Sequence, residues 1–219
     1  MISIALAALA SPVAGAFVAG GLFLVVVAFV VYVLRQRTYF DGPYRVLNAH
    51  CTWHLEEPDA SVAVVTKRHE VEFNYETIAL SDYAWGDGDQ FADYVCEYGT
   101  PLKPRVKDGA REYVVISLPA QRQRGDTATL VSHRTIHNSF PDTTEWVEFE
   151  LKRRARSSTI EVRFPNGRRP TAARLWRKSD GHTHDVTSSL VPEGTRLVFR
   201  HEVRRIRRDD VLRLTWDWP

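Results

Sequence analysis

Apolar and polar residues alternate one by one along many short segments of the chain, and this alternation limits its fold most strongly. Successive side chains of a β-strand point to opposite faces, so alternation produces one buried face and one wet face. Strands of this kind are typical of antiparallel sheets. The clearest segments are residues 69–76, 145–152, 160–164, 197–204 and 212–218. Further strands are predicted at residues 44–55, 112–118, 127–137 and 172–178.

Turn-forming residues separate these segments. Glycine, asparagine, aspartate and proline favour tight turns, either through their backbone freedom or through local hydrogen bonds. They cluster at residues 41–43, 86–89, 108–109, 125–126, 165–167, 180–181 and 193–194. No segment after Leu34 has a convincing helical period. We therefore expect an all-β soluble part, an antiparallel sandwich or barrel, with two immunoglobulin-like units as an open alternative.

The first 34 residues contain no Asp, Glu, Lys or Arg, although the chain has 29 basic and 27 acidic residues. Residues 13–34 form an unbroken apolar run that would span roughly 33 Å as a helix, enough for a bilayer core of about 30 Å. A buried core helix would carry a polar stripe, and a signal peptide would have a shorter apolar region behind a basic start. We therefore predict one transmembrane helix at 13–34, preceded by an apolar extension at 1–12.

Flanking charge predicts the orientation of this helix. Arg35 and Arg37 follow it directly, whereas its N-terminal side offers only the α-amine. The positive-inside rule then places the soluble part in the cytoplasm, behind a juxtamembrane linker at residues 35–43. We therefore predict a single-pass protein of the cell membrane, in which residues 13–34 contact the lipid bilayer. Small residues on one side of the run also permit helix pairing in a homo-oligomer.

Charge divides the soluble part in two. Residues 35–150 contain 12 basic and 19 acidic residues, a net charge of −7, and residues 151–219 contain 17 basic and 8 acidic residues, a net charge of +9. We predict a boundary near residue 150, between an acidic domain at 44–150 and a basic domain at 151–219, or between two halves of one fold. Opposite charges that face each other within one unit explain the pattern. A basic surface for a polyanion or for anionic lipid headgroups explains it equally.

Arginines near a tryptophan in the basic region are the candidate ligand-binding residues. Guanidinium groups suit forked phosphate contacts, and an aromatic ring can stack a base. Charged residues also mark wet sheet faces and protect strand edges, which needs no ligand. The candidates are Arg168, Arg169, Arg174, Trp176, Arg177, Arg204, Arg205, Arg207 and Arg208. The last four are expected in a connection that follows a strand ending near Val203.

Three segments have residue types found in metal sites. In the His-Cys-x-x-His sequence at 50–54, alternation along a strand points Cys51 away from both histidines, whereas zinc needs converging ligands. The His-x-His sequence at 182–184 falls in a predicted hairpin turn, whose polarity explains it. The acidic residues Asp87, Asp89 and Asp93 lack the glutamate that a calcium loop requires at its twelfth position. We predict no metal and no cofactor.

No catalytic motif stands out. The chain has no Gly-x-Ser-x-Gly sequence, and neither Cys51 nor Cys96 lies in a context typical of a reactive thiol. Two cysteines allow at most one internal disulfide. We assign no catalytic residue, and a hydrolase with a site assembled from scattered His, Asp and Cys residues stays an alternative.

In the order of its parts, the chain resembles the membrane-anchored, β-rich effectors of bacterial cyclic-oligonucleotide defence systems. Those proteins join transmembrane helices, typically two, to a small β-domain that binds a nucleotide signal and triggers assembly in the membrane. The resemblance implies a nucleotide-signal sensor and membrane effector. The residues themselves favour a membrane-tethered, non-enzymatic β-sandwich protein used for binding or assembly, with an anionic lipid, a nucleotide or a protein as partner.

Overall fold

The computed structural model describes residues 25–28, 42–56, 58–85, 91, 93–108, 111–151 and 153–219. The chain divides into two compact units, Met1–Gly42 and Pro43–Pro219. In the first unit residues 25–28 are helical and expose their three valine side chains. The rest of the predicted membrane helix and the extension before it lie outside the described residues, as does most of the linker. Among the described residues, no helix combines the length and apolar character needed to cross a membrane.

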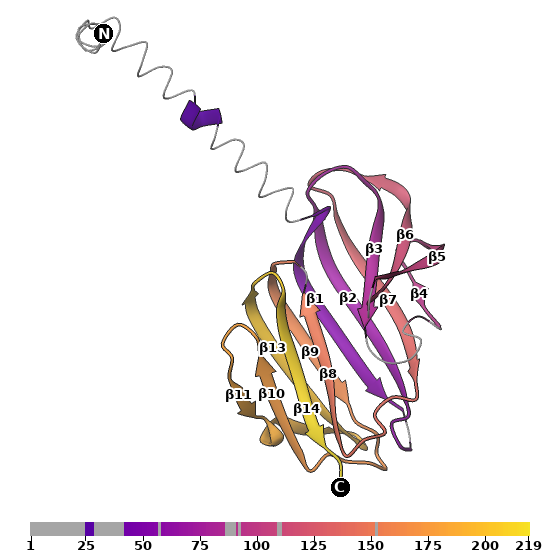
Figure 1. Ribbon diagram of the computed structural model, residues 1–219, viewed down its shortest axis with the longest axis vertical. Helices are drawn as coiled ribbons and strands as arrows, with labels where there is room; N and C mark the ends of the chain where they lie inside the picture. The colour runs from indigo at the N-terminus through magenta and orange to yellow at the C-terminus, as the bar shows by residue number, and fades with distance from the viewer. Residues whose placement is uncertain are drawn as a thin grey trace, which may run out of the picture. The chain divides into compact units, whose positions relative to one another are not determined.

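The unit Pro43–Pro219 consists almost wholly of β-strands, so the all-β prediction for this part is confirmed (Figure 1). The seven-stranded sheet has the order β12 (Leu190–Glu193), β13 (Arg196–Ile206), β9 (Ala155–Arg163), β1 (Tyr44–Leu55), β2 (Val62–Phe73), β7 (Thr127–His137) and β4 (Val95–Cys96). The four-stranded sheet has the order β11 (Thr183–Asp185), β10 (Ala172–Arg177), β14 (Asp210–Asp217) and β8 (Thr144–Leu151). The three-stranded sheet has the order β3 (Thr77–Trp85), β6 (Arg111–Arg122) and β5 (Thr100–Asp108), and a 3-10 turn, η1 (Thr187–Ser189), precedes β12.

The two smaller sheets cover the same face of the seven-stranded sheet. Val162 of β9 and Phe199 of β13 share one apolar core with Trp216 of the four-stranded sheet. Farther along the seven-stranded sheet, Lys67 of β2 reaches Asp82 of β3 in the three-stranded sheet. The unit is therefore a β-sandwich whose second layer is split into two sheets, and the edge strands β8 and β3 border the split.

Most predicted strands are observed. The predicted segments 44–55 and 127–137 coincide with β1 and β7, where alternation is longest. The predicted strand at 69–76 is partly wrong, because β2 ends at Phe73. The backbone N–H of Asn74 donates to the carbonyl of Pro43 at 2.9 Å, and Tyr75 lies exposed in the turn before β3.

One strand pair departs from the expected antiparallel arrangement. β1 and β9 are parallel neighbours, with Cys51 opposite Ile160 and Trp53 opposite Val162. β1 belongs to the acidic region and β9 to the basic region, so residue 150 separates two parts of one sheet. Both regions lie in the compact unit Pro43–Pro219.

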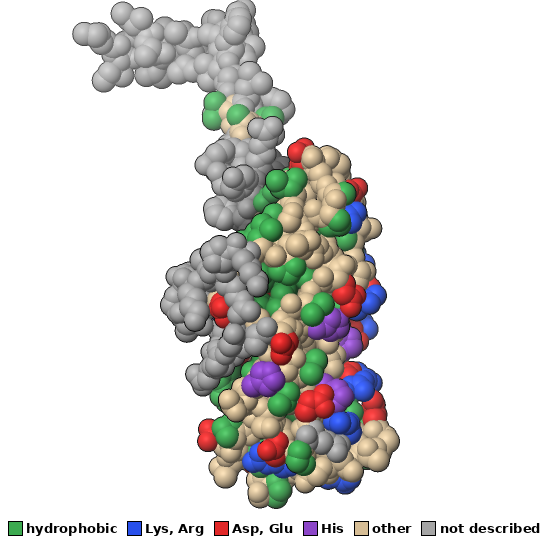
Figure 2. Space-filling model, turned by 90° about the vertical axis from the view of Figure 1, so that its right-hand side faces the viewer, with side chains coloured by type: hydrophobic (Ala, Val, Ile, Leu, Met, Phe, Trp, Pro, Cys, Tyr) green, Lys and Arg blue, Asp and Glu red, His purple; other side chains and the backbone are tan. Residues whose placement is uncertain are grey.

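Opposite charges meet within this unit. Arg213 of β14 donates to the carboxylate of Glu148 of β8 at 2.6 Å, which joins the basic region to the acidic one. Glu161, buried on β9, accepts from Arg163 at 2.6 Å and from Arg200 at 2.7 Å. On the face shown in Figure 2, acidic, basic and histidine side chains lie interspersed. Part of the excess positive charge of residues 151–219 is therefore used in ion pairs.

Candidate functional site

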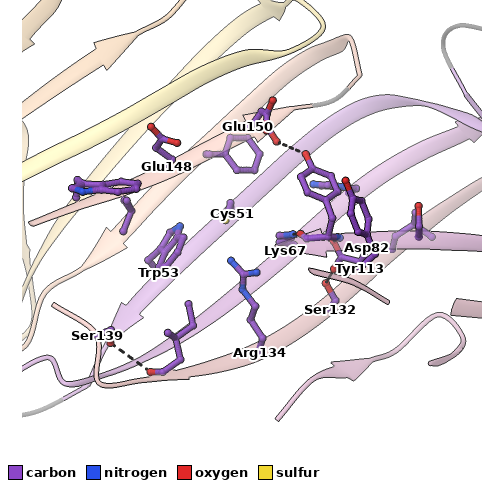
Figure 3. Close-up of a pocket in the computed structure, with 18 of the residues that line it drawn as sticks. Cys51, Trp53, Lys67, Asp82, Tyr113, Ser132, Arg134, Ser139, Glu148 and Glu150 are labelled. Atoms are coloured by element: carbon purple, nitrogen blue, oxygen red, sulfur yellow. Dashed lines mark hydrogen bonds and ion pairs between the residues drawn. The ribbon is translucent and has the colours of Figure 1, made fainter. Parts of the chain in front are cut away.

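A cavity of about 690 Å³ lies where the two smaller sheets meet above the seven-stranded sheet. Side chains of β1, β2 and β7 form its floor, β3 and β8 line it from either side, and the loop at 138–142 closes one end. β3 and β8 approach each other where the hydroxyl of Tyr83 donates to the carbonyl oxygen of Glu150 at 3.1 Å (Figure 3).

Strand register explains why the floor side chains converge. Cys51, Lys67 and Ser132 lie opposite one another on β1, β2 and β7. Trp53 and Arg134 belong to the neighbouring row, two residues farther along their strands. Opposite residues of antiparallel strands point to the same face, and so do residues two apart on one strand. All five side chains therefore point to the cavity side of the sheet.

Asp82 is the centre of a saturated polar network at one side of the cavity. The Lys67 ammonium donates to Oδ1 of Asp82 at 2.9 Å and to the carbonyl oxygen of Tyr83 at 3.0 Å. The hydroxyls of Tyr94 and Ser132 both donate to Oδ2 at 3.1 Å. Burial by itself would raise the pKa of Asp82, but the Lys67 ammonium and its hydrogen bond lower it to about 2. Lys67 and Asp82 form a neutral ion pair in which the ammonium and both carboxylate oxygens have hydrogen-bond partners.

Arg134 is a buried cation of the site with unused hydrogen-bond donors. Arg134 is only 7% exposed. Its Nε and Nη1 atoms are buried without a hydrogen-bond partner among the described residues. Its guanidinium carbon lies 5.8 Å from the centre of the Trp53 ring. Burial lowers the pKa of Arg134, yet an arginine stays charged in proteins. Asp82 attracts this charge, but its carboxylate accepts its hydrogen bonds from Lys67, Tyr94 and Ser132, so Nε and Nη1 of Arg134 keep donor capacity that no described residue uses.

Aromatic rings supply much of the remaining lining. Trp53 and Phe140 meet edge to face with ring centres 6.3 Å apart. At the other end the Arg153 guanidinium lies 4.3 Å from the centre of the Tyr44 ring, and Tyr113 lines the same cavity. Charged side chains lie between these rings, among them Glu145, Glu148 and Arg153, so the cavity offers both apolar surface and polar groups that could orient a ligand.

The loop at 138–142 is held in a strained conformation. Phe140 has a φ angle of +57°, which is uncommon for a bulky side chain and persists only where the surroundings enforce it. The backbone N–H of Ser139 donates to the carbonyl of Ser61 at 2.9 Å. The Arg168 guanidinium donates to the carbonyl of Phe140 at 3.1 Å. These bonds fix the end wall of the cavity and give Arg168 a structural role.

The cavity brings together no activated nucleophile among its described residues. Burial raises the pKa of the Cys51 thiol to about 11, so the unreactive thiol form predominates at neutral pH. The Ser132 hydroxyl donates to Asp82, and the adjacent His133 points to the opposite face of the sheet, where it bonds to Glu97. Both cysteines are free.

The histidines and cysteine that were weighed as metal ligands are placed as follows. Cys51 is buried on the cavity face, and His50 and His54 lie on the other face of β1. His182 and His184 are exposed in the β10–β11 hairpin, with ring centres 6.4 Å apart. Within the described ranges, no three His, Cys, Asp or Glu residues are placed to share a metal ion.

The acidic loop is described only in part. Asp87 and Asp89 lie outside the described residues. Asp93 is described, and one of its carboxylate oxygens lies 3.3 Å from Nε2 of His137 at the end of β7. The contact links the loop to the seven-stranded sheet.

The nine predicted ligand-binding residues are spread over the basic region. Arg168 and Arg169 follow the C-terminal end of β9, whereas Arg204 pairs with Ser157 near its N-terminal end. The length of β9 separates these ends by about 26 Å. β13 continues to Ile206, so the expectation that all four arginines from 204 onward lie in a connection is wrong for the first two.

Several of the nine have partners within the protein. Arg174 pairs with Asp217, and Arg177 donates twice to Asp210, at 2.9 and 2.7 Å. Trp176 lies 5.6 Å from the Arg213 guanidinium. Arg204 contacts Glu202, Arg205 has a φ angle of +56°, and Arg207 is exposed beside them. Of the nine, Arg208 alone lines the described cavity. Ligand binding by the set stays a prediction.

Sequence reasoning missed Arg134, although a signal for it exists. In β7 the residues Leu130, Ser132, Arg134 and Ile136 share one parity, and that parity is the buried one. An arginine between two buried aliphatic residues of a strand is unusual, because burying a cation is costly unless it is paired.

Comparisons with known proteins concern the fold alone. No family model matches the chain, and no curated protein matches it. Among solved structures, a candidate protease from Parabacteroides distasonis matches over 81% of this chain and 41% of its own, with 10% identity and a TM-score of 0.50. An M1 zinc metallopeptidase from Deinococcus radiodurans matches over 79% of this chain and 42% of its own, with 11% identity and a TM-score of 0.42. The chain thus spans about two-fifths of the solved chains that it resembles.

Proposed function

We propose that this protein is a non-enzymatic binding module, tethered to a membrane by residues 13–34, whose cavity takes an anionic group attached to an aromatic or apolar body. The buried guanidinium of Arg134, whose Nε and Nη1 atoms have no hydrogen-bond partner among the described residues, carries the proposal. A cation without hydrogen bonds in the protein interior lowers stability, and an anion bound beside it recovers that loss as binding free energy. The aromatic walls provide the surface for the apolar body of the ligand.

The charge of the cavity floor sets the ligand class. A carboxylate or a phosphate both accept hydrogen bonds from a guanidinium, and such charge-assisted bonds are stronger than neutral ones. Lys67 is already paired with Asp82, so the free donors of Arg134 are the groups on the floor that remain for one anionic group. The nucleotide-sensor alternative shares this chemistry and is therefore included in the test. Arg35 and Arg37 favour a cytoplasmic position for the module.

Calorimetric titration of the full-length protein in detergent tests the proposal. The ligands are 3-phenylpropionate, 2-phenylethyl phosphate, the uncharged 3-phenylpropionamide and a cyclic dinucleotide. We expect an acid to bind at least about tenfold more tightly than the amide, the equivalent of roughly one charge-assisted hydrogen bond. Binding of the cyclic dinucleotide in preference to phenylpropionate would support the sensor alternative.

The matched variants are Arg134→Met and Arg45→Met. Methionine keeps much of the length of arginine but removes its charge, so Arg134→Met should abolish the preference for an acid over the amide. Removing a buried unpaired charge should leave the melting temperature unchanged or raise it. Arg45 is exposed and pairs with Glu72 on the surface, so Arg45→Met controls for the loss of one positive charge. Equal affinities of wild type and Arg134→Met, or no binding of any compound, would overturn the proposal.

A further inference from the structure

Strand β8 presents an unpaired backbone edge to the cavity. The residues of an antiparallel edge strand direct their backbone groups alternately toward the neighbouring strand and away from it. The N–H of Trp218 donates to the carbonyl of Thr143, so odd-numbered residues here face β14. The carbonyl of Glu150 points the other way, where it accepts from Tyr83. The backbone groups of Trp146 and Glu148, which share the parity of Glu150, therefore also point away from β14.

Consecutive residues of β8 line the cavity, as expected for a strand seen edge-on. Residues 145–150 all contribute to the lining, whereas a strand that faced the cavity would contribute every second residue. No described residue hydrogen-bonds the backbone of Trp146 or Glu148 on this side. Figure 3 shows Glu148 and Glu150 on the strand that faces Arg134 across the cavity.

The opposite edge strand, β3, is protected at Tyr83. The carbonyl of Tyr83 accepts from the Lys67 ammonium at 3.0 Å, and its N–H donates to the Asp82 carboxylate at 2.8 Å. Natural sheets commonly place a lysine or an inward-pointing charge at an edge to prevent further strand pairing. β3 is thus protected at Tyr83, whereas Trp146 and Glu148 of β8 offer backbone groups to an added strand.

Arg134 and the open edge of β8 lie near the same end of the cavity. Arg134 precedes the last residue of β7 by three positions, and Trp146 follows the first residue of β8 by two. The loop that lines the cavity end joins these strands. Each residue is thus within roughly 10 Å of the end of its strand that joins this loop.

We infer that the ligand of this cavity is a short extended peptide, which adds a strand to the edge of β8 and places its C-terminal carboxylate on Arg134. The inference rests on the proposed function and names its ligand class. Backbone pairing with Trp146 and Glu148 supplies affinity that does not depend on sequence, as in other cases of strand addition. The aromatic walls receive the side chains of the peptide that point into the cavity.

Four probes separate strand pairing from binding of an acid. They are N-acetyl-Val-Leu-Phe with a free C-terminus, its C-terminal amide, its form N-methylated at the Leu and Phe nitrogens, and 3-phenylpropionate. With the full-length protein, we expect the free-acid peptide to bind at least about tenfold more tightly than each of the other three, the equivalent of one or two hydrogen bonds. Arg134→Met should remove the difference between the acid and the amide.

Hydrogen–deuterium exchange provides a second readout. Backbone N–H groups on an open edge exchange quickly, and pairing with a bound strand slows them. The free-acid peptide should slow exchange in residues 144–151, and 3-phenylpropionate should not. Glu148→Pro removes an edge N–H without touching the β14 ladder, and Glu148→Ala loses the same contact to Arg213. The peptide should bind Glu148→Pro about tenfold more weakly than Glu148→Ala.

The outcomes separate the two claims. If the N-methylated peptide binds as tightly as its parent, or if exchange in residues 144–151 does not change, the strand-pairing inference is wrong. Binding of 3-phenylpropionate that still depends on Arg134 would then leave the proposed function standing. If neither the peptides nor 3-phenylpropionate binds, both are wrong. The N-methylated peptide needs no variant, so the inference can be overturned even if Glu148→Pro does not fold.

Discussion

The Lys67 ammonium lies 2.9 Å from Oδ1 of Asp82, and this ion pair links the seven-stranded sheet to the three-stranded sheet. Both side chains are mostly buried, at 17% and 14% exposure. Lys67→Met would leave the Asp82 carboxylate without its cation. Breaking one side of a buried pair costs more than the pair contributes, because the remaining charge stays desolvated. We expect the free energy of unfolding to fall by about 3 kcal/mol, measured by urea denaturation at pH 7.

The surface pair Arg45–Glu72 serves as the control. The Arg45 side chain is 57% exposed, and ion pairs of this kind typically contribute less than about 1 kcal/mol. Arg45→Met should therefore have a much smaller effect than Lys67→Met. Equal losses of stability in the two variants would show that the Lys67–Asp82 pair is solvated rather than buried.

His69 makes stability depend on pH above the range in which Asp82 titrates. Burial of its ring and the nearby Lys67 ammonium lower the pKa of His69 to about 4, from 6.5 in an unfolded chain. The unfolded state therefore binds a proton first as the pH falls from about 6.5 to about 4, and stability falls over that range. At pH 5 the loss is on the order of 2 kcal/mol.

His69→Gln tests this dependence, because glutamine does not titrate. Urea denaturation at pH 7 and pH 5 should show a smaller loss of stability for the variant than for the wild-type protein. The Asp82 contribution disappears only below the unfolded pKa of about 4, so it does not interfere at pH 5. Parallel losses in both proteins would show that His69 is protonated in the folded state.

Alternation predicted the strands well where one face is buried, and it failed for an edge strand beside the cavity. β1 and β7 were predicted to the residue, since both lie inside the largest sheet. β3 was missed because its sequence does not alternate cleanly: Ile78 is exposed although it shares the parity of the buried Leu80 and Ala84, and the pairing with β6 is irregular between Thr77 and Ala79. As an edge strand, β3 packs on one side and borders a cavity on the other.

The candidate site was harder to predict than the fold. Its floor depends on which residues lie opposite one another on three strands, and its edges depend on two sheets that meet. Neither relationship leaves a local sequence pattern. The arginine pairs of the basic region were conspicuous in the sequence, whereas Arg134 stands alone and is distinguished by its burial rather than by its neighbours in the chain.

Arg168 should be needed for stability, although the sequence singled it out for ligand binding. It donates to the carbonyls of Asp59 and Phe140 at 3.0 and 3.1 Å, and its guanidinium lies 4.5 Å from the centre of the Trp218 ring. A lysine keeps the charge but not the planar fork that reaches both carbonyls. Arg168→Lys should lower the free energy of unfolding by about 1–3 kcal/mol, measured by urea denaturation.

Arg204→Lys is the matched substitution at an exposed site. The Arg204 side chain is 83% exposed and contacts only Glu202 among its described ion-pair partners. Stability should change by no more than about 0.5 kcal/mol. If Arg168→Lys were equally mild, the bonds to the loop at 138–142 would not be needed to hold its strained backbone.

The uncharged N-terminal segment should anchor the protein in the membrane. Residues 25–28 are helical and lie near the middle of the apolar run at 13–34. The full-length protein should stay in the membrane pellet after carbonate extraction, and a form that begins at Arg35 should be soluble.

Val25→Arg with Val26→Arg should weaken insertion, since each arginine costs roughly 2.5–3.5 kcal/mol near the centre of a membrane helix. Ile78→Arg, at an exposed position of β3, adds a charge outside the segment and should not change the fractionation. Release of the full-length protein by carbonate would show that residues 13–34 do not span a bilayer, and the binding module would then act without a tether.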